Sequence, residues 1–363
     1  MLLSDFDFRL PPTQIAQRPL ATRDASRMLV LERRSGPYVD RDFADFPTLL
    51  RGDELLVVNN AQVIPARLRG RRLESSAPTS NERSPAVGAE IEILLARQID
   101  AVTWETLVRP GRKMHVGQRM QFGDGHLQAE VIAHGDHGQR TLRFSSNAGG
   151  DITSQLHATG HIPLPPYIDR ADEPADSERY QTIFASRPGA IAAPTAGLHF
   201  TPEVIAKIRA RGVEICELTL DVGLGTFQPI RSDTLEGHTM HAESYEIPPE
   251  TAERVTRAKR QGRPVVAIGT TAVRALEDAA QRSAQAHSHD VLVAGPGEAR
   301  LFITPGFAFR AVDALLTNFH LPRSTLLALV CAFAGREAVL AAYRHAVEAG
   351  YRFYSYGDCM LIR

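Results

Sequence analysis

Residues 264–277, PVVAIGTTAVRALE, join a short apolar run to a longer amphipathic run through one glycine. The apolar half is typical of a buried strand, and the second half has the periodicity of a helix. Similar pairs recur along the chain, so the sequence favours an α/β fold with a mixed, mostly parallel sheet flanked by helices. The pattern predicts strands at 29–33, 54–59, 213–220, 264–269, 299–304, 314–319 and 351–362, and helices at 202–211, 249–261, 272–284, 324–334 and 337–348.

A different pattern fills the region 90–145. Polar and apolar residues alternate over 90–97, 103–109, 118–123, 127–135 and 140–145, with glycine-containing turns between the segments. Short strands at regular spacing predict a small antiparallel β-barrel. We therefore expect an inserted barrel domain at 69–151 and a discontinuous α/β domain formed by 1–68 and 152–363. The Ser- and Pro-rich stretch 73–88 is expected to be a mobile loop.

Composition limits the classes of protein to consider. The 363 residues are 43% hydrophobic and carry a formal net charge of -1, so any nucleic-acid site must come from local clusters of Lys and Arg. Three widely spaced cysteines argue against a disulfide framework and fit a reducing compartment. The N-terminus lacks a signal-peptide pattern, and the longest apolar stretch is shorter than the roughly 20 residues of a membrane span. We expect a cytoplasmic protein.

Five stretches that are richer in polar and glycine residues than packing requires sit at predicted strand ends, where α/β folds build their sites. One of them, HTMHAES at 238–244, could be an acid–base cluster, a metal site or surface histidines in a loop. The residues of the other stretches could instead have purely structural roles, as loop residues, helix caps or structural histidines. The candidate residues are Thr195, Gly197, His199 and Phe200; Asp221, Gly223, Gly225, Thr226 and Phe227; His238, His241 and Glu243; Gly269, Thr270, Thr271 and Arg274; Asn318 and His320; and, near the C-terminus, Asp358.

Basic residues cluster in and beside the expected barrel. Such clusters can bind phosphates through counterion release, although a charge run is more often a solvated face. The candidates for contact with nucleic acid are Arg67, Arg69, Arg71, Arg72, Arg109, Arg112 and Lys113.

Taken together, the motifs resemble the S-adenosylmethionine:tRNA ribosyltransferase-isomerases of the queuosine pathway. The resemblance covers nearly the whole chain. It rests on DFDFRLPPTQIAQRPL (5–20), DASRMLVL (24–31), VIPARL (63–68), GHIPLPPYI (160–168), APTAGLHF (193–200), VGLGTFQPI (222–230), HTMHAE (238–243), GTTAVRALE (269–277), TNFHLPRSTL (317–326) and FYSYGDCM (353–360).

The resemblance implies an enzyme that attaches the ribosyl unit of S-adenosylmethionine to 7-aminomethyl-7-deazaguanine in a tRNA anticodon. Epoxyqueuosine-tRNA forms, and adenine and methionine leave. It also implies an α/β domain with an inserted barrel and no metal. The sulfonium acidifies the neighbouring C5′ hydrogens, so a positioned base can start the reaction, and adenine needs a proton to leave.

Within this reaction, we assign acid–base work to His238 and His241, with Glu243 orienting one of them. Phe227 and the 223–225 turn would hold the adenine or the target base. Thr270, Thr271 and Arg274 would bind the methionine carboxylate, and His199 and His320 are further candidates.

The chain departs from the family pattern at two positions. Asp221 stands where the family commonly has His, and Asn60 where it commonly has Asp. Two other functions stay open: a non-catalytic RNA-binding protein, and a metal-dependent hydrolase built on His238, His241 and Glu243. We expect a monomer.

Overall fold

The computed structural model describes residues 1–33, 37–73, 87–135, 138–223, 234–235, 237, 240 and 242–363. The chain divides into two compact units. The first comprises residues 1–62, 165–170 and 179–363, and the second comprises 63–164 and 171–178. The insert expected at 69–151 falls within the second unit.

The first unit is built on a nine-stranded sheet in the order β15-β13-β12-β3-β14-β16-β17-β1-β2. The four strands from β12 to β16 are parallel to one another, and antiparallel pairs flank them, so the sheet is mixed. Its strands are β1 (Arg27–Leu31), β2 (Tyr38–Asp42), β3 (Leu55–Asn59), β12 (Glu214–Leu220), β13 (Glu243–Ile247), β14 (Val265–Ile268), β15 (Gly295–Ala299), β16 (Ala314–Asn318) and β17 (Cys359–Ile362). A separate pair joins β4 (Ala61–Val63) to β11 (Arg187–Ala190).

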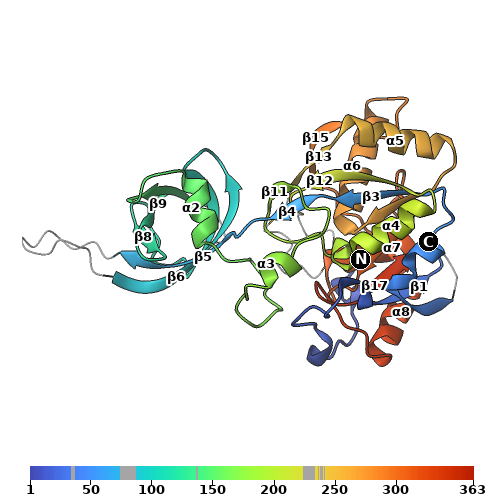
Figure 1. Ribbon diagram of the computed structural model, residues 1–363, viewed down its shortest axis with the longest axis horizontal. Coiled ribbons are helices and arrows are strands. Elements are labelled where there is room, and N and C mark those ends of the chain that lie inside the picture. Colours follow the sequence, from blue (N-terminus) through green and yellow to red (C-terminus); the bar gives the residue numbers. More distant parts are fainter. Residues whose placement is uncertain are drawn as a thin grey trace, which may run out of the picture. The chain divides into compact units, whose positions relative to one another are not determined.

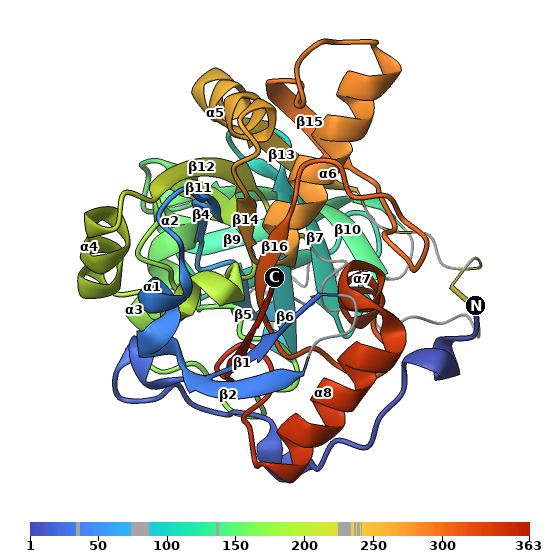
Figure 2. The same cartoon turned by 90° about the vertical axis from the view of Figure 1, so that its right-hand side faces the viewer.

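Helices cover both faces of this sheet. Alternate residues of β3 separate the two cores: Leu55 and Val57 face one, and Leu56 and Val58 face the other. Figure 2 shows α1 and α4 on one side of β14 and β16, with α6 and α7 on the other. The elements are α1 (Phe46–Leu49), α4 (Pro202–Ala210), α5 (Pro249–Arg260), α6 (Thr270–Gln285), α7 (Thr325–Ala334) and α8 (Arg336–Glu348), with short 3-10 turns η1 (Leu3–Phe6), η2 (Pro12–Gln14), η3 (Arg23–Ala25), η4 (Phe43–Asp45) and η6 (Thr195–His199).

The second unit is a closed antiparallel barrel in the order β10-β7-β6-β5-β8-β9 (Figure 1). Gly70 of β5 makes the closure possible, because a Cβ there would lie 2.3 Å from the carbonyl oxygen of Gln121. The elements are β5 (Arg67–Leu73), β6 (Val87–Gln98), β7 (Thr103–Arg109), β8 (Arg119–Phe122), β9 (Leu127–His134), β10 (Gln139–Ser146) and α2 (Ile152–Thr159); α3 (Asp176–Arg179) follows.

The predicted fold class is therefore confirmed, with local differences. The strand expected at 299–304 is wrong, because β15 ends at Ala299 and residues 300–304 have no regular structure. Of the strand expected at 351–362, only Cys359–Ile362 forms, since the preceding residues turn tightly so that Asp358 N can bond Arg352 O. The loop expected at 73–88 lies, for residues 74–86, outside the described residues.

In the described part of the chain, no single helix has the length and hydropathy needed to cross a membrane. Helices α7 and α8 meet that test only as a pair bent by 116°.

Candidate functional site

Strand direction brings the polar motifs of the first unit to one edge of its sheet. The parallel strands β12, β3, β14 and β16 all end there. The antiparallel strands β13 and β17 begin there, and so does β1, which is parallel to β17. We call this the carboxyl edge. Its polar residues, from one side of the sheet to the other, are Glu243, Asp221, Asn59, Thr270, Thr271, Asn318, Asp358 and Ser26.

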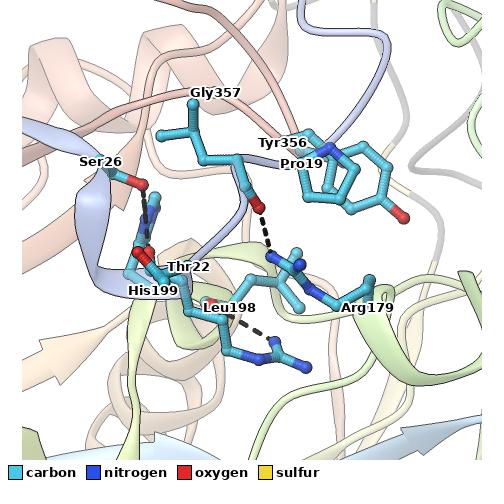
Figure 3. Close-up of a pocket in the computed structure, with 11 residues that line it drawn as sticks. Pro19, Thr22, Ser26, Arg179, Leu198, His199, Tyr356 and Gly357 are labelled. Carbon is cyan, nitrogen blue, oxygen red and sulfur yellow. Dashed lines mark hydrogen bonds between the residues drawn. The ribbon is translucent and has the colours of Figure 1, made fainter. Parts of the chain in front are cut away.

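A small cavity of about 20 Å³ opens at the β16–β17–β1 end of this edge. His199, on η6, forms part of its wall, and its Nδ1 lies 2.8 Å from Ser26 Oγ while its Nε2 lies 3.3 Å from Asn318 Oδ1. In Figure 3, Ser26 and His199 point toward each other, and Arg179 lies across the cavity from them. The lining residues are Pro19, Leu20, Thr22, Arg23, Ser26, Arg179, Leu198, His199, Ser355, Tyr356 and Gly357.

His199 is a neutral imidazole in this setting. Burial lowers its pKa to about 4, although the bond to Asn318 opposes that shift. Asn318 is itself held by its Nδ2, which donates to Tyr354 O at 2.9 Å. The imidazole is thus oriented from both sides and exchanges hydrogen bonds without carrying charge at neutral pH.

Asn59 joins the strand ends in the middle of the edge. Its Oδ1 accepts from Ala61 N and Leu220 N, each at 3.0 Å, and its Nδ2 donates to Leu220 O at 2.9 Å. A longer contact of 3.4 Å runs from the same nitrogen to Thr271 Oγ1. One amide therefore ties the end of β3 to β12 and to the first turn of α6.

Glu243 and Arg274 form a buried ion pair, with side chains 5% and 6% exposed. Arg274 also donates to Ala299 O at 2.9 Å, and Glu243 Oε1 accepts from Gly223 N at 3.3 Å. The sequence predicts that Glu243 orients a histidine and that Arg274 binds a carboxylate. In the structure both side chains already hold β13, β15 and α6 together.

Two more predicted residues are fully engaged by the fold. The carboxylate of Asp358 accepts from Arg27 N and Arg352 N, at 2.9 and 2.8 Å. His320 lies behind the edge: its Nε2 is 2.8 Å from Thr317 Oγ1, and burial lowers its pKa to about 3.

The remaining members of the 192–200 motif serve mainly the packing of η6. The ring of Phe200 is fully buried against Phe43 and Phe46, so it belongs to the core. Gly197 is needed for close approach, because a Cβ there would lie 2.9 Å from Thr182 Cγ2. Thr195, which opens η6, is only half-buried.

Asp221 differs from the other carboxylates of the edge. It is half-buried, and its Oδ1 is buried without a hydrogen-bond partner among the described residues. Burial raises the pKa of this carboxyl. The expected sites at His238, His241, Gly225, Thr226 and Phe227 lie outside the described residues.

The barrel has its own polar surface. Arg69 and Arg71 of β5 and Arg109 of β7 line a groove of about 670 Å³, together with Glu90 and Glu92 of β6. Arg71 lies 3.5 Å from Glu90. Arg69 and Arg109 are exposed, and within the described part of the chain neither guanidinium has an ion pair.

The other basic candidates fall outside that groove. Arg67 donates to Leu164 O at 2.8 Å and is mostly buried. Arg72 is half-buried, whereas Arg112 and Lys113 are exposed in the turn after β7.

Comparison with known proteins identifies the chain. A family model described as queuosine biosynthesis protein matches residues 3–362. The chain belongs to the queuosine biosynthesis protein family. Its curated relatives include S-adenosylmethionine:tRNA ribosyltransferase-isomerases of Solibacter usitatus, 51% identical over 368 residues, and Moorella thermoacetica, 49% identical over 362 residues, with all of each chain covered.

A solved structure of the same family is also similar. It is the S-adenosylmethionine tRNA ribosyltransferase of Thermotoga maritima, which is 37% identical, with a TM-score of 0.54 over 99% of this chain and 100% of that one. The resemblance seen in the motifs is thereby confirmed.

Several residues of this queuosine-family site were not singled out from the sequence. The cavity beside His199 is also lined by Ser26, Arg23 and Arg179. Asn59 bonds the end of β3 to the end of β12. Ser26 directly precedes β1, which begins two residues before the strand predicted at 29–33, and only the sheet's strand directions reveal that β1 begins where the others end.

The two buried histidines predict an acid-sensitive fold. Their folded pKa values lie near 4 and 3, below the ordinary value of about 6.5. Below pH 6.5 the unfolded chain binds protons that the folded chain does not. The free energy of unfolding should therefore fall as pH drops from about 6.5 toward 4, by about 1.4 kcal/mol per pH unit for each histidine.

Urea unfolding between pH 5 and 6.5 measures this slope. The variant His320→Gln should remove the contribution of one histidine to this slope, whereas His289→Gln, at an exposed position, should leave the slope unchanged. An equal slope in His320→Gln and the wild type would contradict a neutral buried imidazole at this position.

The Glu243–Arg274 pair predicts strong coupling in stability. Removing either partner alone would leave a buried, unpaired charge. Glu243→Ala and Arg274→Ala should therefore each lower the free energy of unfolding by about 3–5 kcal/mol, and the double variant should lower it by less than the sum of the two. Matched changes at the more exposed Glu250–Arg254 pair should cost less than about 1 kcal/mol. Additive losses in urea unfolding would show that the buried pair does not act as a unit.

Proposed function

We propose that this chain transfers and isomerises the ribosyl unit of S-adenosylmethionine onto 7-aminomethyl-7-deazaguanine in a tRNA anticodon. Epoxyqueuosine-tRNA is formed, and adenine and methionine are released. The observation that carries the proposal is full-length similarity, at 51% identity, to a relative named for this activity. The polar edge supplies the kinds of groups that the reaction needs.

The proposed roles are distributed along the carboxyl edge. His238 and His241 do acid–base work on the departing adenine and the attacking amine. The 223–227 segment holds a base, and His199 orients a substrate hydroxyl or amide. Thr270 and Thr271 receive the methionine carboxylate at the first turn of α6, whose N–H groups have no side-chain cap. Arg274, paired with Glu243, supports that turn from behind.

We further propose that the barrel binds the tRNA backbone. Arg69 and Arg109 supply unpaired guanidinium groups at the groove, and Arg71, Arg112 and Lys113 add positive charge around it. Arg67 and Arg72 position β5. Contacts of this kind give affinity without sequence information.

The three cysteines are buried and unbridged, which supports a reducing, cytoplasmic setting, and we propose that the chain acts as a monomer. Among the described residues, no group of three His, Cys, Asp or Glu side chains is placed to hold a metal. The relatives' shared name favours the transferase over a metal-dependent hydrolase and over a non-catalytic RNA-binding protein.

The function is tested by mixing purified protein with S-adenosylmethionine and tRNA bearing 7-aminomethyl-7-deazaguanine. We expect free adenine to equal, mole for mole, a ribosyl-derived mass gain on the tRNA, both measured by mass spectrometry. The same tRNA with guanine at that position serves as the control. A methyl gain without adenine would indicate a methyltransferase, and neither product would favour the RNA-binding alternative.

The barrel groove makes a separate prediction. Arg69→Ala and Arg109→Ala should each weaken tRNA binding and reduce the slope of log affinity against log salt by about 1. Binding of S-adenosylmethionine should not change. Arg97→Ala is the matched control, because Arg97 is an exposed barrel arginine already paired with Glu105. Unchanged salt slopes in both groove variants would remove the groove from the tRNA interface.

A further inference from the structure

The turn that follows β12 holds Asp221 in a fixed position. Its backbone N donates to Ser244 O at 3.0 Å. The next carbonyl, of Val222, accepts from Ile191 N at 3.2 Å, and Gly223 N donates to Glu243 Oε1 at 3.3 Å. Three successive residues are thus tied to β13 and to the segment after β11. The direction of the Asp221 side chain follows from a rigid backbone.

The carboxylate at this position is desolvated without compensation. Its Oδ1 is buried and has no hydrogen-bond partner among the described residues. One side is closed by Gly189, where a Cβ would lie 3.0 Å from that oxygen, and where φ is +154°. An unsatisfied buried acceptor lowers the stability of a protein, and since no described residue satisfies this one, it is available to a ligand.

The described residues of the neighbouring elements place little unpaired charge near this carboxylate. β11 carries Arg187, which is exposed, and β13 presents Ser244 beside Asp221. Glu243 meets the same turn, but its charge is paired with Arg274. Within the described part of the chain, burial is the cause that raises the Asp221 pKa. A desolvated carboxylate of this kind is a stronger base than an exposed one.

Resting on the proposed function, we infer that Asp221 is the base that removes a proton from C5′ of S-adenosylmethionine. The C5′–H bond breaks, the proton passes to a carboxylate oxygen, and the electron pair stays on C5′ beside the positive sulfur. No oxidant or reductant is required. The carboxyl later releases its proton to solvent. His238 and His241 are then left to donate the proton that adenine needs in order to leave.

The test compares wild type, Asp221→Asn and Glu246→Gln, an exposed carboxylate-to-amide control on β13. Each is given S-adenosylmethionine and the modified tRNA. Asp221→Asn should release adenine roughly 100- to 10,000-fold more slowly than wild type. It should still bind S-adenosylmethionine in equilibrium dialysis. Its thermal midpoint should be equal or higher, because the amide removes a desolvated charge.

The outcomes separate the two proposals. If wild type releases no adenine, the proposed function fails. If wild type is active and Asp221→Asn keeps a rate within threefold of it, or loses binding of S-adenosylmethionine instead of rate, the assignment as a base is overturned. A pH profile of the wild type gives an independent check should the variant not fold: kcat/KM must fall as pH drops through the raised Asp221 pKa, and a flat profile down to the ordinary Asp range overturns the inference.

Discussion

The direction of the strands in the nine-stranded sheet is the constraint on which the site depends. Parallel pairing of β12, β3, β14 and β16 requires their carboxyl ends to share one edge. The antiparallel strands β13 and β17 then bring Glu243, the first residue of β13, and Asp358, which directly precedes β17, to the same edge. Groups more than 300 positions apart in the sequence, such as Arg27 and Asp358, meet only because of these directions. Asn59 completes the arrangement by bonding β3 to β12 where the backbone ladder ends.

Buried carboxylates of the first unit fall into two classes. Glu277 accepts three backbone N–H groups, from Arg310, Ala311 and Val312, and so fixes the loop before β16. Asp358 and Glu243 are satisfied in comparable ways, by backbone N–H groups or by Arg274. Each of these groups stabilises the scaffold, since a hydrogen bond to a charged group contributes about 1.5–3 kcal/mol. Among the described residues, none gives Asp221 such a bond, so the contacts of that part of the chain do not account for its burial. That contrast separates a residue placed for a ligand from residues placed for the fold.

The sequence allowed the fold class, the barrel and most helices to be predicted, because their periodicity is local. The helix after Thr201 begins and ends as predicted, since Thr201 caps Val204 N and Gly212 adopts a positive φ. Pairing within the site could not be predicted in this way. Residue type alone does not distinguish His199, which lines a cavity, from His320, which lies behind the edge. Nor does it reveal that Arg274 is already paired. Such facts depend on which side of a strand or helix faces which neighbour, and that is decided by tertiary packing.

The two departures from the family pattern meet at the end of β12. Asn60 donates through Nδ2 to Glu217 Oε2 at 3.0 Å and accepts from Thr219 Oγ1 at 2.7 Å. An aspartate at 60 would oppose the Glu217 carboxylate unless one of the two held a proton. The amide therefore removes a charge from the end of β3, while Asp221 introduces one two residues beyond Thr219. The chain thus carries an amide at the end of β3 and a carboxylate just beyond β12, where no described residue neutralises it. In the proposed role this carboxylate accepts the proton that a neighbouring sulfonium makes acidic, while other groups of the edge bind the substrate.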